Sequence, residues 1–303
     1  MLGAAAGGLL GGCSTQKPPR PSEQQHGHRL FGISLTGALP QSVEIAESVG
    51  AALNRQPQVL NFFAAWEWRA PFPEDTVKAI REANAIPEIT WEPWDPRAGP
   101  VQPAYELAHL DAYDSYVDDF ARGCAEYGDT IMLRFAHEMN SDWYPWSASG
   151  NSGSPAAYVA AYRRVHQRLS AAGADNVRWV WCPNHIYNNR PDLIEASYPG
   201  DDVVDIVAVD GYNRGGQTPF EVFNTAFDLL NRIAPKKPLW INEVGCIATP
   251  DKPQWITDFF SWLATTRVEC VVWFEISLVG EPDWRLLSTP ESTAAARAAL
   301  DKW

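Results

Sequence analysis

The sequence predicts a single (β/α)8 barrel, in which eight parallel strands close into a cylinder inside a ring of helices. Its 303 residues suit one such domain. Eight short apolar segments recur along the chain, and most are followed by a loop and an amphipathic segment. The alternative is a doubly wound open sheet, which is disfavoured because no GxGxxG-type turn follows an early strand.

The expected strands share a short apolar run, and they cover residues 30–34, 58–65, 86–90, 131–138, 177–181, 203–209, 238–243 and 269–275. The expected helices cover residues 41–52, 73–85, 105–127, 154–169, 191–197, 218–233 and 253–265, with a last one from about residue 291. Pro73 followed by two acids, and Ser154 followed by Pro155, are typical helix starts. The segment 191–197 is the shortest of the expected helices.

The chain divides into three parts. Residues 1–13 resemble a bacterial lipoprotein signal, because a run of small residues and Leu ends in Leu10-Gly-Gly-Cys13. No Lys or Arg precedes that run, so a disordered tail is the alternative interpretation. Residues 14–29 are rich in Pro, Gln and His and predict a linker, and residues 30–303 form the predicted catalytic domain. We therefore expect a secreted or envelope protein, lipid-anchored through Cys13, with no transmembrane helix.

The overall charge restricts the class of partner. The formal net charge is −13 and the pI is about 4.9, which disfavours nucleic acid and anionic membrane surfaces. A neutral small or polymeric substrate fits best, and we expect a monomer. No CxxC pair or Cys/His spacing typical of a metal site occurs, so no metal or cofactor is predicted. The pairing of Cys124, Cys182, Cys246 and Cys270 is left open.

The predicted strand ends carry the candidate chemistry, since function in this fold sits at the C-terminal ends of the strands. Those ends supply Trp66, Trp91, His137, Glu138, Tyr212, Glu243 and Trp273. Glu138 and Glu243 end the fourth and seventh strands, which face each other across a barrel mouth. Two opposed carboxylates are the minimal machinery for glycoside hydrolysis. A lone Glu is more often an ion-pair or capping group, but a pair at matched strand ends beside indoles favours catalysis.

Two motifs resemble glycoside hydrolase family 26. His137-Glu-Met-Asn140, followed by Trp143, resembles the family's acid/base motif, and Asn242-Glu-Val-Gly245 resembles its nucleophile strand. The resemblance implies a retaining β-glycoside hydrolase that cleaves a neutral polysaccharide by double displacement. Glu138 would be the acid/base and Glu243 the nucleophile, without a cofactor.

The resemblance also implies substrate-binding residues. His137 would orient the sugar or Glu243, Tyr212 would hydrogen-bond the nucleophile, and Trp143 and Trp273 would stack on sugar rings. Asp210 falls where family members carry sugar-contacting groups. Further substrate contacts are expected from Asn140, Trp146, Trp66 and Trp91.

The stretch Ser141 to Trp146 departs from the run that often follows the motif in family mannanases. The resemblance implies endo-β-1,4-mannanase (mannan endo-1,4-β-mannosidase-like) or β-1,3-1,4-glucanase activity. Because of the departure, β-xylan or an envelope polysaccharide is left open as the substrate. The sugar, the linkage and endo or exo action are not fixed by the motif.

Other functional classes fit less well. An HExxH zinc site would need His at position 141, where Ser stands, and no GxSxG nucleophile elbow occurs. The alternative from another class is a non-catalytic carbohydrate-binding envelope protein involved in exopolysaccharide assembly. Such a protein would keep the tryptophans but would not need both Glu138 and Glu243.

Overall fold

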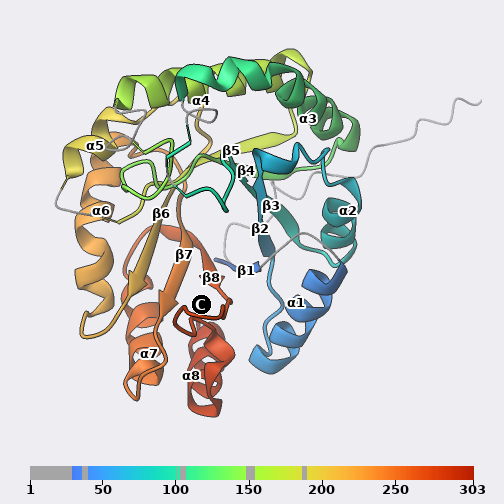
Figure 1. Ribbon diagram of the computed structural model, residues 1–303. Helices are drawn as coiled ribbons and strands as arrows, with labels where there is room; N and C mark the ends of the chain where they lie inside the picture. The colour runs from blue at the N-terminus through green and yellow to red at the C-terminus, as the bar shows by residue number, and fades with distance from the viewer. Residues whose placement is uncertain (1–28, 36–39, 100, 103–106, 148–153, 186–189) are drawn as a thin grey trace, which may run out of the picture.

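The computed structural model describes residues 29–35, 40–99, 101–102, 107–147, 154–185 and 190–303. Its eight strands pair in parallel in chain order and close on each other, β8 with β1, as the sequence predicts (Figure 1). The strands are β1 (Leu30–Leu35), β2 (Val59–Ala65), β3 (Ile86–Glu92), β4 (Ile131–Phe135), β5 (Val177–Trp181), β6 (Ile206–Asn213), β7 (Leu239–Cys246) and β8 (Val268–Phe274).

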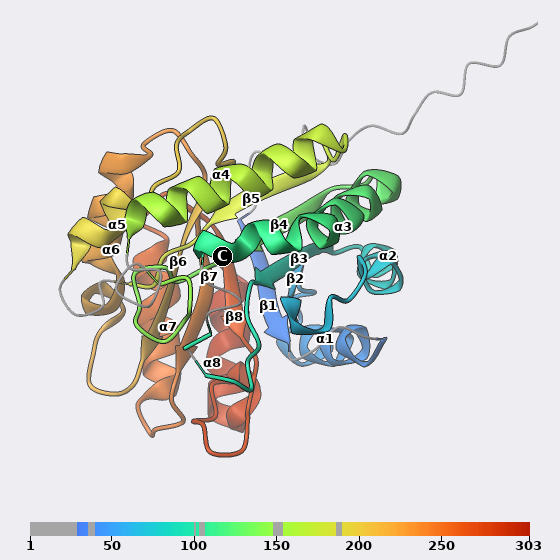
Figure 2. The same cartoon turned by 45° about the horizontal axis from the view of Figure 1, so that its top comes forward.

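Helices surround the strands in a ring (Figure 1), and in the tilted view α3 and α4 lie across the upper part of the picture (Figure 2). They are α1 (Pro40–Leu53), α2 (Glu74–Glu82), α3 (Asp114–Tyr127), α4 (Pro155–Ala171), α5 (Pro191–Ala196), α6 (Pro219–Ile233), α7 (Lys252–Leu263) and α8 (Pro290–Leu300). Short 3-10 segments η2 (Trp66–Trp68), η4 (Leu107–Tyr113) and η6 (Leu286–Ser288) precede helices. The Ser154 hydroxyl accepts from the Ala157 amide and caps α4, as the Ser-Pro start predicts.

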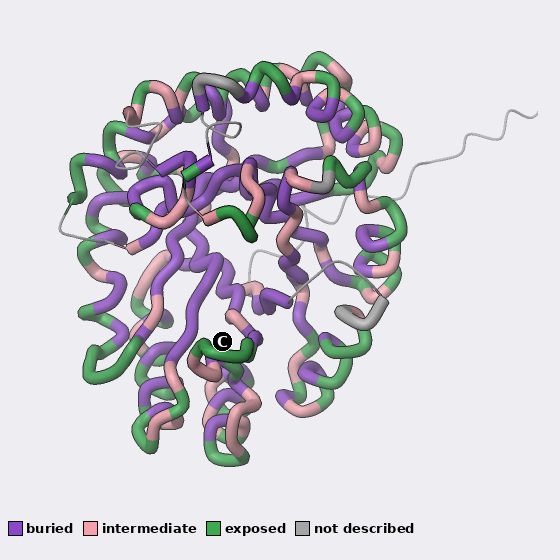
Figure 3. The backbone as a smooth tube through the Cα atoms, in the orientation of Figure 1, coloured by how far each residue is buried: buried purple, intermediate pink, exposed green. Residues whose placement is uncertain are grey.

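The barrel interior has two layers. The end of the barrel at which the strands begin is closed by an apolar cluster that includes Val59, Met132, Ile206, Trp240 and Val272. Above this cluster the inward side chains become polar, and they include Asn61, Glu88, Thr90, Arg134, Asp210 and Asn242, all fully buried. The strands are buried almost throughout, whereas the helices alternate between buried and exposed faces (Figure 3). The polar layer lies under the candidate site and supplies its fixed charges.

Close packing at the first strand explains a glycine inside the barrel wall. A Cβ built on Gly32 would lie 2.7 Å from the Val59 carbonyl oxygen and 2.8 Å from the Val59 Cβ. Neither atom can move without shifting β2, which pairs with β1 at this point. Any larger residue at position 32 would therefore widen the β1–β2 seam.

The two ends of the described barrel are tied together. The Trp303 indole donates to the Leu30 carbonyl at 3.1 Å, and the Arg29 guanidinium lies 4.7 Å from the Trp303 ring centroid. Arg29 also donates to the Leu263 and Thr266 carbonyls at the end of α7. The last residue thus covers the start of the first strand.

Several expected boundaries differ from the structure. The fourth strand ends at Phe135 and not at Glu138, and the sixth begins at Ile206 and not at residue 203. The expected helix over residues 105–127 is split, within its described part, into η4 and α3.

The four cysteines of the described chain, Cys124, Cys182, Cys246 and Cys270, are buried free thiols. Cys13 and nearly all of the predicted linker lie outside the described residues. Within the described residues, no helix is both long and apolar enough to span a membrane.

Candidate active site

Glu138 stands just past the end of β4, where the backbone leaves the strand conformation. Ala136 and Glu138 both have left-handed φ angles, of 47° and 51°. This conformation is strained for residues with a Cβ and persists where the surroundings fix it. Here the Ala136 amide donates to the Trp91 carbonyl at 3.1 Å and the Glu138 amide donates to the Cys182 carbonyl at 2.7 Å. The turn brings His137 and Glu138 to the mouth together.

The Glu138 carboxyl group is buried and bonded at both oxygens. The Asn184 amide donates to Oε1 at 2.5 Å and the Trp143 indole donates to Oε2 at 2.8 Å. Burial, followed by the charge of Glu243, raises the pKa of Glu138 to about 7, against the lowering effect of the two donors. A carboxyl group with this pKa can hold a proton near neutral pH and also release it.

Glu243 owes its position to a β-bulge in β7. Val209 of β6 pairs with Ile241, but the next residue, Asp210, pairs with Glu243, so that Asn242 is an extra residue. The same shift recurs against β8. A regular strand would point Asn242 and Glu243 to opposite faces, whereas the bulge lets both face the barrel interior. There Asn242 donates to Glu88, and Glu243 reaches the mouth.

Two donors hold the Glu243 carboxylate. Arg134 contacts Oε1 and the Tyr212 hydroxyl donates to Oε2. Arg134 also donates from Nη1 to both Asp210 oxygens, at 2.8 and 2.9 Å. Burial acts to lower the pKa of Arg134, but the charges of Asp210 and Glu243 outweigh it and raise that pKa well above its usual range. Arg134 therefore places a permanent positive charge beside Glu243.

His137 joins the mouth to the β4 loop. Its Nε2 lies 3.2 Å from the Tyr144 hydroxyl and 3.9 Å from Glu243 Oε1. Burial and then Arg134 lower the pKa of His137 well below its usual range, so the ring is neutral. The Trp146 indole donates to the His137 carbonyl at 2.6 Å. His137 Nδ1 is buried without a hydrogen-bond partner in the structure.

A cation site can be tested on the same residues. His137, Asp210 and Glu243 each offer a ligand atom within 4.8 Å of the others. Arg134, however, is already ion-paired with two of the three, Asp210 and Glu243. A divalent cation would have to displace or adjoin that guanidinium, so the arrangement suits carboxylate chemistry and not metal binding.

Aromatic rings line the mouth. Phe63 and Phe274 are partly exposed, and they lie edge to face with ring centroids 6.4 Å apart. Phe274 is likewise edge to face with Tyr212, at 5.6 Å. Trp143 and Tyr144 are also partly exposed on the β4 loop. Apolar ring faces next to buried carboxylates are the surroundings that a sugar ring needs.

Trp66 and Trp91 do not lie where the sequence predicts, in contact with substrate. Both are fully buried, with ring centroids 4.8 Å apart. Trp91 stacks on Phe120 of α3 at 4.2 Å, and its indole donates to the Tyr116 hydroxyl. The two rings belong to the core between the barrel and its helices, because Trp91 lies on the outward face of β3 and Trp66 packs against it from η2.

Trp273 is a third correction. It is fully buried, its indole donates to the Trp284 carbonyl at 2.8 Å, and it packs against Trp255 and Phe259 of α7. Its neighbour Phe274 is the β8 residue that lies at the mouth. The sequence predicts Trp273 at the mouth, whereas the structure places the next residue, Phe274, there.

Asn140 and Trp146 were also predicted to contact substrate, and the structure places them behind the site. Asn140 is 3% exposed and bonded to the β5–α5 connection. Trp146 is fully buried and stacks on Tyr144 with centroids 4.2 Å apart. Both side chains hold the β4 loop and present no free surface to a ligand. Glu138, Glu243, His137, Trp143 and Tyr212 do come together as predicted.

Besides the mouth aromatics Phe63, Tyr144 and Phe274, three polar residues of the site are not predicted as site residues. Arg134 had a visible signal, a cation among apolar residues on the inward face of β4. Glu92, 6% exposed, had a similar one at the end of β3; burial raises its pKa to about 8. Asn184 follows β5 in a Cys-Pro-Asn segment with no pattern of its own, and its contact with Glu138 becomes visible only in three dimensions.

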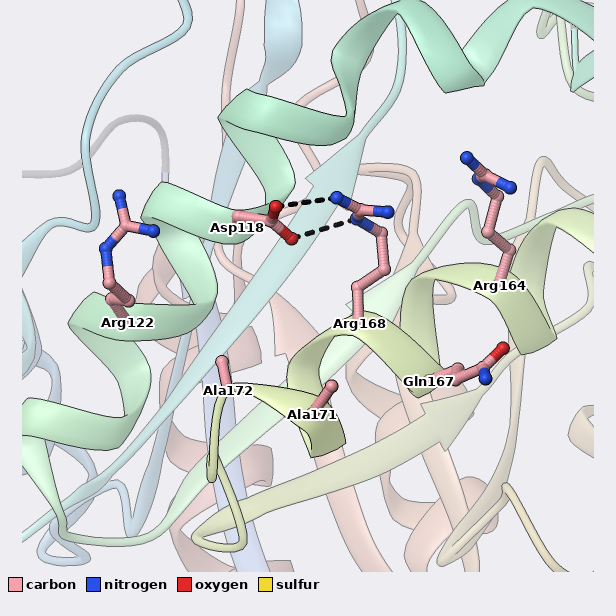
Figure 4. A pocket seen from close by; sticks show the side chains of 7 residues that line it. All are labelled: Asp118, Arg122, Arg164, Gln167, Arg168, Ala171 and Ala172. Carbon is pink, nitrogen blue, oxygen red and sulfur yellow. Dashed lines mark hydrogen bonds and ion pairs between the residues drawn. The ribbon is translucent and has the colours of Figure 1, made fainter.

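A separate surface hollow of about 680 Å³ lies between α3 and α4. Asp118 and Arg168 pair across it at 2.9 and 2.6 Å, with Arg122, Arg164 and Gln167 around them (Figure 4). None of its lining residues is aromatic, and none belongs to the carboxylate site. It lacks the apolar ring surface that sugar binding uses.

The chain is similar to several known proteins. The profile of glycosyl hydrolase family 26 matches residues 101–251. The chain is 32% identical over 271 residues to endoglucanase H of Acetivibrio thermocellus. The match covers 84% of this chain and 28% of that protein. It is 31% identical over 137 residues to mannan endo-1,4-beta-mannosidase A and B of Caldalkalibacillus mannanilyticus, covering 43% and 25%. The chain spans about a quarter of the length of these curated relatives.

Solved structures show the same architecture. A Cellulomonas fimi endo-beta-1,4-mannanase double mutant superposes with a TM-score of 0.71 at 18% identity, covering 90% of this chain and 70% of the other. The catalytic domain of a Bacillus sp. JAMB-750 endo-beta-1,4-mannanase gives 0.69 at 17%, covering 90% and 86%. At identities this low the likeness establishes the fold alone.

Proposed function

The chain belongs to glycosyl hydrolase family 26, as its motifs predict, and we propose that it is a retaining endo-β-glycanase. The observation that carries the proposal is the contrast between its two mouth carboxyl groups. Glu138 has neutral donors and a raised pKa, whereas Glu243 is bonded to the Arg134 guanidinium. A glycosidase needs this division, one carboxyl group protonated and the other ionised.

In the first step Glu243 attacks the anomeric carbon while Glu138 transfers its proton to the departing glycosidic oxygen. The C–O bond to the leaving sugar breaks, and an ester between the sugar and Glu243 forms. Tyr212 supports the attack because its own pKa is raised well above the usual range, by burial and then by the charge of Glu243. Its hydroxyl stays protonated and keeps donating to Glu243.

In the second step Glu138 acts as a base. Now ionised, it takes a proton from a water molecule, whose oxygen attacks the anomeric carbon and releases Glu243. The two displacements restore the original β configuration. The hydrogen bonds from Asn184 and Trp143 stabilise the ionised Glu138 that this step requires.

For substrate, we place mixed-linked β-glucan first and β-1,4-mannan second. The match to an endoglucanase extends over 84% of this chain, while the matches to the mannanases of Caldalkalibacillus mannanilyticus and Bacillus subtilis extend over 43% to 60%. The departure of residues 141–146 from the mannanase pattern points the same way. A secreted, Cys13-anchored protein is part of the proposal, and intact-mass analysis of the mature N-terminus tests it.

The assignment of the two acids is tested by Glu138→Gln and Glu243→Gln. Each should lower polysaccharide turnover by at least ~10²-fold, since each removes a proton donor or a nucleophile. Circular dichroism should show an unchanged fold. Glu126→Gln, on the exposed face of α3, is the matched control and should keep full activity. Wild-type turnover in both site variants would refute the assignment.

Substrate and stereochemistry need separate measurements. The full chain is incubated with mannan, mixed-linked glucan, laminarin and β-1,3- and β-1,4-xylan, and products are sized. Proton NMR of the first product on the preferred polymer should show the β anomer. An α anomer formed first would mean inversion, and no cleavage of any polymer would favour a carbohydrate-binding role.

A further inference from the structure

The segment Cys182 to His185, which follows β5, contacts the candidate acid/base directly. The Asn184 side chain donates to Glu138 Oε1 at 2.5 Å, and the Cys182 carbonyl accepts from the Glu138 amide at 2.7 Å. Both the carboxyl group and the backbone of Glu138 are therefore fixed by this one segment. Asn184 is 4% exposed, so solvent does not compete for its amide.

Asn140 fixes the position of Asn184. Asn140 Oδ1 accepts from the backbone N–H of Asn184 at 2.8 Å, and Asn140 Nδ2 donates to the backbone carbonyl of Asn184 at 3.0 Å. These reciprocal bonds, which we call the asparagine clamp of Asn140 and Asn184, join the β4 loop to the β5–α5 connection. The Asn140 side chain and the Asn184 backbone thus satisfy each other in a buried setting, where an unmade hydrogen bond is costly.

The same segment is anchored on its other side by β6. Asn184 forms an isolated parallel bridge with Asp210: the Asp210 amide donates to the Pro183 carbonyl at 3.0 Å, and the His185 amide donates to the Asp210 carbonyl at 2.7 Å. The Asp210 carboxylate in turn holds Arg134, which contacts Glu243. One continuous chain of contacts thus runs from the acid/base to the nucleophile through Asn184, Asp210 and Arg134.

We propose that Asn184 is a positioning residue for the acid/base of the glycosidase proposed above: held by Asn140, it orients Glu138 and stabilises its ionised form. The inference deepens that function and depends on it. The Asn184 amide faces Oε1 while the Trp143 indole faces Oε2, so the plane of the carboxyl group is fixed by two donors. Without the Asn184 donor, Glu138 can rotate away from the glycosidic oxygen.

The groups facing Glu138 decide the expected direction of a pH shift. They are Asn184 of the β5–α5 connection, Trp143 of the β4 loop, Arg134 of β4 and the carboxyl groups of Glu243, Glu92 and Asp210. Burial and the charge of Glu243 raise the pKa of Glu138, whereas Asn184, Trp143 and Arg134 lower it. Loss of the Asn184 donor should therefore move the basic limb of the activity profile to higher pH.

The test uses the full chain with Asn184→Ala and the isosteric Asn184→Asp, both of which remove the amide donor. On the preferred polysaccharide, kcat/KM should fall ~10–100-fold, less than the ~10²–10⁴-fold that a general acid contributes, because Glu138 itself remains. On an aryl glycoside with a dinitrophenolate leaving group, which needs no protonation, kcat/KM should stay within about two-fold. The basic limb should move up in both variants.

Asn140→Ala keeps the donor but breaks the clamp, and it should give a smaller loss with the same substrate dependence. Asn224→Ala, on the surface of α6, is the matched control and should change nothing. Equal losses on both substrates, or an unmoved basic limb in the variants that fold, would overturn the positioning role. A wild-type chain inactive on every substrate would instead overturn the proposed function.

Discussion

At the scale of single residues, the proton on Glu138 decides when the first step can occur. Burial and the neighbouring Glu243 raise its pKa to about 7. The protonated form that assists the leaving group is therefore present below about pH 7 and is lost above it. Arg134, whose pKa is raised well above its usual range, keeps its charge throughout this window.

The pH profile of kcat/KM should consequently fall on its basic side with a midpoint near 7, about tenfold per unit beyond it. Initial rates on the preferred polysaccharide between pH 5 and pH 10 measure this. The dinitrophenyl glycoside serves as the control, because its cleavage should not show that limb. A polysaccharide profile that stays flat to pH 9 would contradict the role given to Glu138.

Two of the residues predicted wrongly at this scale, Trp91 and Trp273, share one cause. Side chains alternate between the two faces of a strand. Trp273 has the parity of Val271 on the outer face of β8, and Trp91 has the parity of Ile89 on the outer face of β3. Counting back from residues known to face outward could have placed both rings in the core. His137 and Glu243 break the same count, because a left-handed turn and a bulge, respectively, re-aim them.

At the scale of elements, the β4 loop is a small folded unit of its own. Tyr144 stacks on Trp146 at 4.2 Å, and the Trp146 indole bonds the His137 carbonyl. Periodicity predicted the eight strands and most of the helices from apolar runs alone. Periodicity could not predict this loop. The contacts between the loop's aromatic rings and the end of β4 follow no repeating spacing in the sequence, and no local sequence pattern signals them.

Trp146→Ala should destabilise the protein by ~3–5 kcal/mol, the usual cost of removing a buried large aromatic side chain. It should also lower kcat, since the backbone that carries Glu138 loses its support. Thermal unfolding and kinetics below the new transition temperature measure the two effects. Trp262→Ala, which removes a ring stacked on Phe227 away from the mouth, should lower stability without lowering kcat. Unchanged kcat in Trp146→Ala would contradict the loop's supporting role.

At the scale of the whole molecule, the polar layer of the barrel makes stability depend on pH. Burial raises the pKa of Glu88 to about 7 and of Glu92 to about 8. Between the ordinary carboxyl pKa and these values, the folded state binds more protons than the unfolded state. The slope of unfolding free energy with pH is then negative.

We therefore expect these two groups to make the unfolding free energy fall as pH rises from about 4.5, the ordinary carboxyl pKa, to about 8, and to leave it level above that. Urea titrations at each pH measure it. Glu88→Gln, which cannot ionise, should flatten the slope while keeping an acceptor for Asn61 or Asn242. A slope of the same size in that variant would remove Glu88 from the explanation.

The contact of Trp303 with Leu30 has a consequence for chain order. Because residues 29 and 303 lie against each other, a few Gly and Ser residues can join them, and the backbone can be cut elsewhere without disturbing the barrel. The exposed link between Pro235 and Lys236, before β7, is a suitable place for new ends. Such a circular permutant of residues 29–303 should fold and keep its activity. In it the first and last strands follow each other along the chain, as they already do in the sheet.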